Sequence, residues 1–364
     1  MKKYKIVSLF SGGGGLDLGF KKANFDIVFA TDIDESAVLT YKKNISEKII
    51  QADINTLPMS TFPDCDVIIG GPPCQAFSLA GKRDTDDPRA KLVFKYLEII
   101  KCKLPKIFLM ENVTGILSAK TKEGKKVIDE LISSFKEIGY ELKYNILEAT
   151  DFGIPQKRRR VILVGTRKGF EFSFPKPNHG DGLLPYVTAY DALGDLPDCI
   201  GVKSGTQNYK CNPFTDYQKL MRLDSINVSD HFEQSTSQLD KYIIAHVKPG
   251  GNYMDIPLEV NSKRIRRLIQ DGGHTTCYGR LDPNKPSYTI NTYFNRPNVG
   301  CNIHYEQDRL ISLREALRLQ SFPDTFVVVS SSKQKKNMIV GNAVPPMLAY
   351  ELALSIKKAL KEVE

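Results

Sequence analysis

The sequence is poor in the residues that build metal centres and disulfide frameworks. Its 364 residues include seven cysteines and five histidines. The cysteine number is odd, no two cysteines form a CxxC pair, and no HExxH or HxxxH arrangement occurs. These absences argue against a zinc site and against a disulfide scaffold. We therefore expect free thiols and no metal.

Long hydrophobic runs are missing as well. The apolar segments VIIGG (67–71) and VILVG (161–165) are far shorter than the roughly 20 residues of a membrane helix. The N-terminus is too briefly apolar for a secretory signal. With 41% hydrophobic and 26% charged residues, the composition is that of a globular chain. We expect a cytoplasmic protein without a membrane partner.

The charge balance is moderately basic. The formal net charge is +9 at pH 7. Such an excess fits a polyanionic partner such as nucleic acid. An ordinary basic enzyme explains the same number equally well, so charge alone does not decide between them.

Short apolar strands alternate with helical patterns in the first 170 residues. This rhythm predicts an open, mostly parallel sheet with helices on both faces. In such sheets ligands bind at the carboxyl ends of the strands. The strand-like runs are 5–10, 26–31, 66–71, 106–112, 140–147 and 160–166, and the clearest helical stretches between them are 92–101 and 124–139.

The rhythm changes near residue 173. The segment 174–185 is rich in proline and glycine and indicates a linker or domain boundary. Residues 180–300 show no clear alternation of strands and helices. Helical patterning resumes at 312–322, and a last helix is expected over 345–363, after a proline.

A glycine-rich turn, FSGGGGLDLGF (10–20), follows the first strand. It suits a nucleoside ligand, but it is neither a P-loop nor a GxGxxG dinucleotide motif. Asp32 ends the next strand and can bind ribose hydroxyls. Asp53 follows a third strand and can accept a hydrogen bond from an adenine amino group. An adenosine pocket without a phosphate site fits S-adenosylmethionine better than NAD.

The sharpest signal is the run DVIIGGPPCQAFS (66–78), in which a buried strand leads through Gly-Gly and Pro-Pro to Cys74. Because proline fixes φ, the thiol is expected to be held rigidly at the rim of the sheet. A catalytic cysteine must be an exposed thiolate near positive charge or amide dipoles. The alternative is a buried small residue in a strand-end turn, which we assign to the other six cysteines.

An acid and a group of arginines complete the set. Glu111 lies at the end of the strand KIFLMEN and is expected to be partly desolvated, as a proton-sharing acid requires. In QKRRR (156–160), alternation along a strand places Gln156, Arg158 and Arg160 on one face. The alternatives are a surface acid and a solvated basic edge strand.

In this order, these motifs closely resemble those of the C5-cytosine DNA methyltransferase family, of the prokaryotic restriction-modification type. The resemblance rests on FSGGGGLDLGF, GPPCQAFS, ENV and QKRRR, and it extends to HYEQDRLISLREALRLQSFPD (304–324) and GNAVPP (341–346). It covers the chain except about 180–270. It implies a Rossmann-like S-adenosylmethionine-dependent methyltransferase sheet of the α/β class, with a smaller and irregular target-recognition domain.

The resemblance also implies which residues hold the cofactor S-adenosylmethionine, whose product is S-adenosylhomocysteine. Phe10 would stack on the adenine, Asp32 would bind the ribose hydroxyls, and Asp53 would bind the adenine amino group. Ile33 stands where an aromatic residue of the family sandwiches the adenine. The other implied cofactor contacts are Gly12, Gly14, Ile54, Pro73, Asn342 and Val344.

The implied reaction is methylation of C5 of a cytosine that has been flipped out of duplex DNA. Cys74 would add to C6 and so make C5 nucleophilic. Glu111 would bind N3 and the 4-amino group, Arg160 would hold O2, and Arg158 would order the pocket by ion pairing. The target base must leave the helix stack before it can react.

Several residues are expected to contact DNA. The resemblance places Arg89 in the loop that closes over DNA and Thr289 on a backbone phosphate, and His274 is a candidate for filling the gap left by the flipped base. Arg264, Arg266, Arg267 and Arg296 are candidates by charge alone, for which phosphate contact is favoured over base reading. Gln156 is the remaining candidate.

The expected domains are a catalytic and cofactor-binding domain over 1–175 plus 330–364, and a target-recognition domain with its hinge over 176–329. We expect a monomer that acts on double-stranded DNA, with a restriction endonuclease as a separate partner. Three alternatives stay open: a tRNA methyltransferase of the same superfamily, a non-catalytic DNA-binding regulator, and an unrelated dehydrogenase. The target sequence cannot be deduced from the residues.

Overall fold

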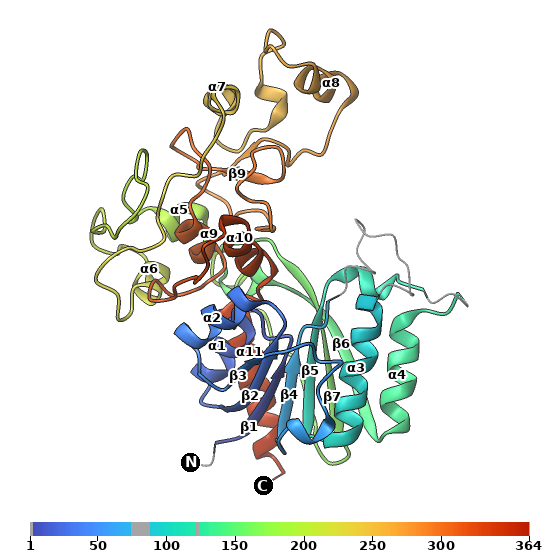
Figure 1. Cartoon of the computed structure of the whole chain (residues 1–364). Helices are drawn as coiled ribbons and strands as arrows, with labels where there is room; N and C mark the ends of the chain where they lie inside the picture. The colour runs from blue at the N-terminus through green and yellow to red at the C-terminus, as the bar shows by residue number, and fades with distance from the viewer. Residues whose placement is uncertain (1–2, 74–87, 121–123, 364) are drawn as a thin grey trace. The chain divides into compact units, whose positions relative to one another are not determined.

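The computed structural model describes residues 3–73, 88–120 and 124–363. The chain divides into two compact units, each assembled from separate stretches of sequence (Figure 1). Unit 1 comprises Met1–Glu148, Arg159–Lys176 and Pro346–Glu364, and unit 2 comprises Ala149–Arg158 and Pro177–Pro345. The boundaries expected for the functional domains stay a prediction, since a division by contacts does not assign function.

Unit 1 is built on a seven-stranded sheet with the strand order β3-β2-β1-β4-β5-β7-β6. The strands are β1 (Lys5–Leu9), β2 (Asp26–Asp32), β3 (Ile49–Gln51), β4 (Val67–Gly70), β5 (Ile107–Asn112), β6 (Tyr140–Glu148) and β7 (Arg159–Arg167). The first five pair in parallel, whereas β7 runs antiparallel to both β5 and β6. The prediction of a mostly parallel sheet is confirmed.

Helices cover both faces of this sheet, as the alternation of elements predicts (Figure 1). Helices α3 and α4 lie on one face, and α1 and α11 lie on the other. The helical elements of unit 1 are α1 (Gly15–Lys22), α2 (Glu35–Asn44), η1 (Met59–Thr61), α3 (Pro88–Lys103), η2 (Thr114–Leu117), α4 (Val127–Glu137) and α11 (Pro346–Lys361).

Strand alternation explains how the core is divided between the two faces. Val7, Ile68 and Phe108 point to the α3 and α4 side, where they form one buried cluster with residues of both helices. Each fully buried side chain of this kind contributes about 1.5–3 kcal/mol of hydrophobic stabilisation. On the other face α1 approaches α11 closely: a Cβ at Gly19 would lie 2.4 Å from the Cβ of Ala349.

One acid is buried beneath the glycine turn. Asp17, in the first turn of α1, is fully buried, and its Oδ1 accepts a hydrogen bond of 2.7 Å from the hydroxyl of Tyr41. Burial raises the pKa of Asp17 from 3.8 to about 6, although hydrogen bonds from Tyr41 and Ser8 oppose the shift. The charged form of Asp17 therefore weakens the fold.

Asp17→Asn is expected to raise the free energy of unfolding, and more so at pH 8 than at pH 5. The folded-state pKa exceeds the unfolded one, so the folded state binds more protons between the two values, and stability falls as the pH rises from about 4 to about 6. Above pH 6 the penalty is constant and on the order of 3 kcal/mol. Urea unfolding at both pH values measures it, and an equal gain at both would contradict the assignment.

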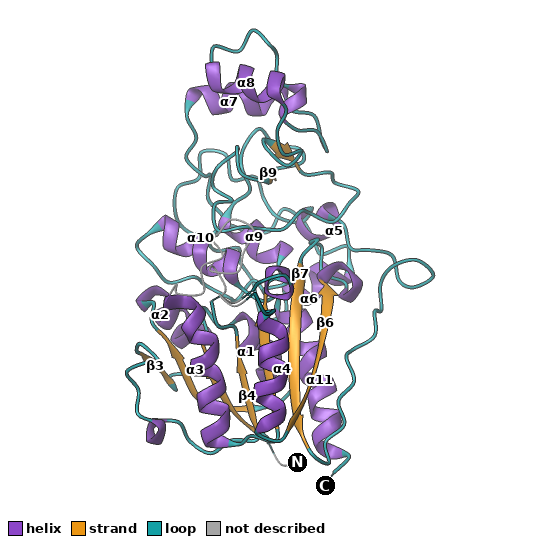
Figure 2. Cartoon of the chain, turned by 90° about the vertical axis from the view of Figure 1, so that its right-hand side faces the viewer, coloured by secondary structure: helices purple, strands orange, loops and turns teal. Residues whose placement is uncertain are grey.

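Unit 2 is dominated by loops (Figure 2). Its elements are short: η3 (Ala149–Phe152), α5 (Ala189–Leu193), α6 (Asp216–Met221), α7 (Gln238–His246), η4 (Tyr253–Asp255), α8 (Lys263–Asp271), β8 (Gly279–Arg280), β9 (Cys301–Ile303), α9 (Leu313–Leu319) and α10 (Lys333–Asn342). This agrees with the missing strand–helix rhythm in 180–300. With so little regular secondary structure, unit 2 depends on side-chain interactions to fix the conformation of its loops.

Buried ion pairs on α9 tie these loops together. The guanidinium of Arg318 lies 2.8 Å from Asp195 Oδ1 and 2.7 Å from Asp324 Oδ2, and all three side chains are completely buried. Glu315 lies on α9 one turn before Arg318. It accepts two hydrogen bonds, of 2.7 and 2.8 Å, from Arg309, which precedes the helix. Removing one partner of such a pair leaves an uncompensated buried charge. The motif 304–324 therefore organises the fold of unit 2.

A separate small core lies at one end of unit 2. It joins α7, η4 and α8 through Ile243, Tyr253, Ile265 and Tyr278, all of them buried. We call the part of unit 2 built on this core, residues 238–278, the α7–α8 module. In both views it lies at the end of unit 2 remote from α9 and α10 (Figures 1 and 2).

The segment Lys333–Lys361 is the one stretch of the described residues with the length and hydropathy of a membrane span. However, 61% of its most apolar window is buried inside the protein. The helix is also interrupted, because α10 ends at Asn342 and α11 begins at Pro346. These features are those of core helices, so they favour the expected absence of a membrane span in this segment.

Candidate active site at the carboxyl edge of the sheet

The glycine turn after β1 is fastened to the end of β2. Gly12 N donates to Oδ2 of Asp32 at 2.8 Å, and Ser11 N donates to the carbonyl of Thr31 at 3.1 Å. Phe10 and Gly14 both have positive φ, of 55° and 91°. At position 14 a Cβ would lie 2.6 Å from Ile45 Cγ1, so only glycine fits. The turn therefore brings the backbone close to the carboxylate of Asp32.

Asp32 is a partly buried acid at the end of β2. Its Oδ1 accepts a hydrogen bond of 2.9 Å from Asp34 N, and its Oδ2 accepts the one from Gly12. Burial raises the pKa of Asp32, and these backbone hydrogen bonds oppose the shift. Each carboxylate oxygen has a second lone pair, so Asp32 can still accept the two hydroxyls of a ribose.

The neighbouring residues fit an adenine ring. Ile33 directly follows Asp32 and is 67% exposed, so its apolar side chain is accessible to a ligand. Ala52 N donates to the carbonyl of Asp32 at 3.0 Å, which brings Asp53 beside the same strand end. Asp53 is exposed, whereas Ile54 is 4% exposed and belongs to the core cluster. An exposed apolar side chain and two carboxylates near one strand end match the chemistry of adenosine.

We call the segment Gly-Pro-Pro-Cys (71–74), which follows β4, the Pro-Cys loop. Its start is attached to the end of β5. Asn112 Nδ2 donates to the carbonyl of Pro72 at 3.3 Å. The described chain reaches Pro73 and stops there, so Cys74 lies outside the described residues. Arg89 is in the first turn of α3, and its side chain lies outside the description as well.

Glu111 and Arg160 form an ion pair at the same edge. Arg160 Nε lies 2.7 Å from Glu111 Oε1, and each side chain is only 13% exposed. The pair forms because β7 runs antiparallel to β5, so the start of β7 meets the end of β5 (Asn112 lies opposite Val161). The other carboxylate oxygen, Oε2, faces Gly71: a Cβ there would lie 3.0 Å away. The acid is thus positioned between an arginine and the Pro-Cys loop.

Arg158 and Gln156 belong to unit 2 and precede β7, which begins at Arg159. Arg158 is 1% exposed and donates from its two terminal nitrogens to the carbonyls of Ile290 (3.0 Å) and Gly341 (2.8 Å). We expected Arg158 to order the pocket by ion pairing, whereas these two nitrogens bind backbone carbonyls.

Gln156 is completely buried. Its Nε2 donates to the carbonyl of Leu319 at 3.2 Å, and its Oε1 accepts from Ile290 N at 2.9 Å. Both ends of the amide are therefore used inside unit 2, which favours a structural role over the predicted contact with DNA.

The other predicted residues also lie in unit 2. Asn342 is the last residue of α10, and Val344 is buried just after it. His274 and Thr289 are exposed, and the Thr289 hydroxyl donates to the carbonyl of Lys157 at 2.6 Å. Arg264 and Arg267 lie on α8. Their roles stay predictions.

Burial suppresses the reactivity of three of the six other cysteines. Burial raises the pKa of Cys65, Cys199 and Cys301 to about 12, so these thiols are protonated at neutral pH and unreactive. This agrees with the structural role expected for them, whereas Cys102 and Cys211 are exposed and do not have the buried position expected of all six. Among the described residues, no group of three His, Cys, Asp or Glu side chains is arranged to hold a metal ion.

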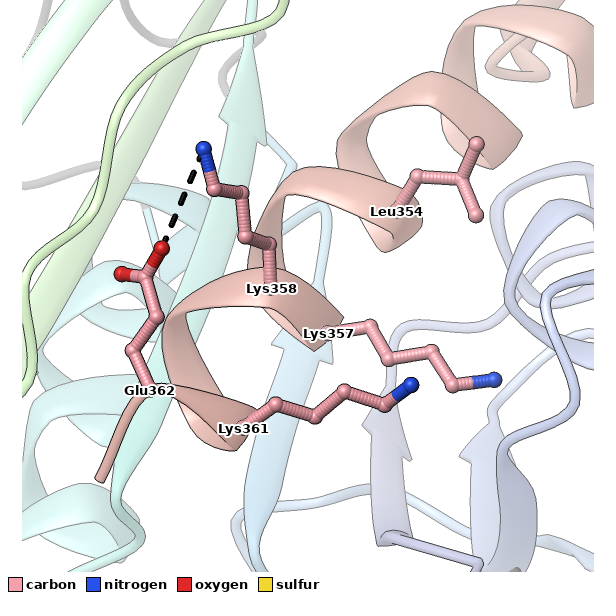
Figure 3. A pocket seen from close by; sticks show the side chains of 5 residues that line it. All are labelled: Leu354, Lys357, Lys358, Lys361 and Glu362. Carbon is pink, nitrogen blue, oxygen red and sulfur yellow. Dashed lines mark ion pairs between the residues drawn. The ribbon is translucent and has the colours of Figure 1, made fainter. Parts of the chain in front are cut away.

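A shallow pocket elsewhere does not belong to this site. It lies along the last turns of α11 and is lined by Leu354, Lys357, Lys358, Lys361 and Glu362 (Figure 3). Lys358 pairs with Glu362 at 3.8 Å, and Lys357 donates to the carbonyl of Ala23 at 2.7 Å. Within unit 1 the last turns of α11 are at the end of the sheet opposite to the carboxyl end of β5 (Figure 1).

Two positioning residues escaped the sequence analysis. Gly71 leaves room for the carboxylate of Glu111, and Asn112 holds the carbonyl of Pro72. The signals were present, because Gly71 directly precedes Pro-Pro and Asn112 directly follows the acid. Only the pairing of β4 with β5 shows that the two motifs meet.

Gly71→Ala is expected to lower kcat roughly 10-fold, because the new Cβ pushes the Glu111 carboxylate by a few tenths of an ångström. Steady-state kinetics on DNA measure the effect. Gly139→Ala is the control for alanine substitution in unit 1: its Cβ meets no atom, although its φ of 86° makes alanine more strained there than at Gly71, where φ is not positive. An unchanged kcat for Gly71→Ala would show that the carboxylate does not need this space.

Comparison with known proteins gives a consistent result. A family model described as C-5 cytosine-specific DNA methylase matches residues 4–358. Type II methyltransferase M.NgoFVII of Neisseria gonorrhoeae is 36% identical, over 97% of this chain and 86% of its own. Type II methyltransferase M.MthTI of Methanothermobacter thermautotrophicus is 37% identical over 98% of both chains.

The fold agrees with solved structures too. A prophage-encoded protein of E. coli that bears the name DNA modification methyltransferase superposes with a TM-score of 0.77 at 25% identity, over 99% of this chain and 100% of its own. The expected Rossmann-like methyltransferase fold is thereby confirmed. Since the family model spans nearly the whole sequence, the resemblance seen in the motifs is confirmed as well, and the chain belongs to the C-5 cytosine-specific DNA methylase family.

Proposed function

We propose that the chain methylates a flipped-out cytosine through a covalent bond between Cys74 and C6, with Glu111 and Arg160 acting on the same ring. Membership of the family implies S-adenosylmethionine-dependent methylation of cytosine C5 in DNA. The observation that supports these residue roles is the ion pair of Glu111 and Arg160 beside Gly71, three residues before Cys74.

The roles follow from the chemistry of the base. The Cys74 thiolate adds to C6, and the electron pair displaced toward N3 is stabilised by a proton shared with Glu111. Arg160 donates to O2 while it holds the Glu111 carboxylate in place. C5 then accepts the methyl group, its proton leaves to a base, and the C6–S bond breaks to restore the thiolate.

S-adenosylmethionine, when bound, supplies the electrophilic methyl group and leaves as S-adenosylhomocysteine. We propose that Phe10, Asp32, Ile33 and Asp53 hold its adenosine part. The fit rests on the exposed Ile33 directly after Asp32 and on the close approach of the Gly12 backbone to Asp32. The additional contacts proposed are Gly14, Ile54, Pro73, Asn342 and Val344, together with Gly12.

We also propose which residues contact DNA and in which cellular context the enzyme acts. We propose that 176–329 recognises double-stranded DNA, that Arg89 and Thr289 contact it beside the target, and that His274 fills the vacated position in the helix. The relatives are named type II methyltransferases. We therefore propose a cytoplasmic, monomeric modification enzyme that acts alongside a separate restriction endonuclease.

Incubation with labelled S-adenosylmethionine and either duplex DNA or tRNA tests the proposal. We expect label in duplex DNA, on 5-methylcytosine, and none in tRNA. Label in tRNA alone would favour the RNA methyltransferase alternative. Binding of DNA without any transfer would favour the non-catalytic regulator.

A further inference from the structure

Helix α8 in unit 2 carries its charges and its apolar residues on opposite faces. At 100° per residue, Ile265, Leu268 and Ile269 lie together on one side. Ile265 is completely buried, and all three belong to the core of the α7–α8 module. The apolar face is therefore already occupied by the protein itself.

The opposite face consists of Lys263, Arg266, Arg267 and Gln270, all exposed. Their spacing is i, i+3, i+4 and i+7, which places four hydrogen-bond donors in one row along the helix. Among the residues that the structure describes, no acidic side chain forms an ion pair with Lys263, Arg266 or Arg267. Three cations are thus presented to solvent with their donors unused.

This charge pattern is not the one that stabilises a helix. The first turn contains no acid and begins with Lys263 and Arg264, and the last turn contains no base and ends with Asp271. The helix dipole favours the reverse arrangement. These cations therefore destabilise the isolated helix. An anionic partner that covers them explains why they are present.

The helix is held firmly in spite of this cost. The side chain of Ser262 caps its start by accepting from Ile265 N at 3.4 Å. On the flank, Arg264 donates to the hydroxyl of Tyr278 at 2.6 Å, so this arginine serves the module and not the exposed face. Beyond the helix, Tyr253 fixes Gly273 through its hydroxyl at 2.9 Å.

We propose that α8 enters the major groove of the DNA substrate and that Arg266 and Arg267 read base edges there. This rests on the proposed function and deepens it, since charge alone favoured only phosphate contact for these arginines. An α-helix fits the major groove, where arginine binds guanine O6 and N7 with two hydrogen bonds and glutamine binds adenine. Lys263, at one end of the row, reaches a phosphate.

The test begins with the methylated sequence of the full-length protein. Expression in a host without cytosine methylation, followed by bisulfite sequencing, defines it. Arg266 and Arg267 are then each replaced by lysine and by glutamine, and Kd is measured on cognate and unrelated duplexes over a range of salt concentrations. Lys248→Gln is the matched control, since Lys248 is an exposed cation of the same module outside α8.

Arginine-to-lysine exchange separates base reading from phosphate contact. Lysine keeps the charge but not the two parallel donors. We expect Arg266→Lys or Arg267→Lys to keep the salt dependence of Kd while discrimination between cognate and unrelated DNA falls by about 5- to 150-fold. The glutamine variants are expected to lose the same discrimination while the salt slope changes little, because a slope lower by about 1 marks the loss of a phosphate contact. The methylated sites should become more varied in both series, and Lys248→Gln should leave them unchanged.

Two results would overturn the proposal. Full rescue of discrimination by lysine in both positions would reduce the arginines to phosphate contacts. Unchanged discrimination in all four variants would remove α8 from base reading altogether. A wild-type protein that methylates no DNA would instead contradict the proposed function. Circular dichroism confirms that each variant is folded.

Discussion

Cys74→Ser is expected to abolish methyl transfer while DNA and cofactor affinities stay close to those of the wild type. A serine hydroxyl is not ionised at neutral pH, whereas a cysteine thiol near positive charge is the stronger nucleophile and reacts as its thiolate. Loss of the nucleophile in a covalent enzyme can cost a factor on the order of 10⁶ in kcat. Single-turnover transfer to duplex DNA measures the loss, and equilibrium titration measures the two affinities.

Covalent trapping provides the complementary measurement. With 5-fluorocytosine at the target position the C5 substituent cannot leave as a proton, so the wild type should form a cofactor-dependent complex that survives denaturation. Cys74→Ser should form none. Cys102→Ser, which alters an exposed thiol on α3, should behave as the wild type. Near-normal turnover of Cys74→Ser would disprove the covalent route.

Glu111→Gln is expected to lower kcat by about 10²–10⁴-fold, the range for loss of a general acid or base, with little change in cofactor affinity. Glutamine has nearly the shape of glutamate, but it can neither share a proton with N3 nor form the ion pair with Arg160. Pre-steady-state methyl transfer measures the change.

The control for Glu111→Gln is Glu141→Gln, which removes an exposed acid that pairs with Lys143 at 3.5 Å on β6 of the same sheet. This variant should keep wild-type rates. If Glu111→Gln turned over as fast as the control, Glu111 would have no part in proton transfer.

Much of unit 1 could be predicted from the sequence, for a definite reason. The central strands β1, β2, β4 and β5 are mostly buried and apolar, so their positions follow from local pattern, and parallel pairing brings their ends to one edge. Asp32 and Glu111 therefore could be assigned to that edge from their place after a strand. The glycines and prolines that follow β1 and β4 marked the turns.

What escaped prediction depends on contacts between distant residues. The pairing of Glu111 with Arg160 requires β7 to insert antiparallel beside β5, which no local pattern specifies. The shared face expected for Gln156, Arg158 and Arg160 is wrong, because β7 begins only at Arg159. Gln156 and Arg158 instead bind backbone atoms in the interior of unit 2. In unit 2 the short helices depend on buried ion pairs such as Arg318 with Asp195, whose partners are 123 residues apart.

The chain passes back and forth between the two units. This restricts which segments can be exchanged to change the DNA specificity. Ala149–Arg158 belongs to unit 2, although Arg160 is part of the sheet. Through Gln156 and Arg158, this decapeptide binds backbone atoms of Ile290, Leu319 and Gly341. A chimera that imports residues 177–345 from a relative must therefore import 149–158 with them. Exchanging only the α7–α8 module leaves every one of these bonds in place.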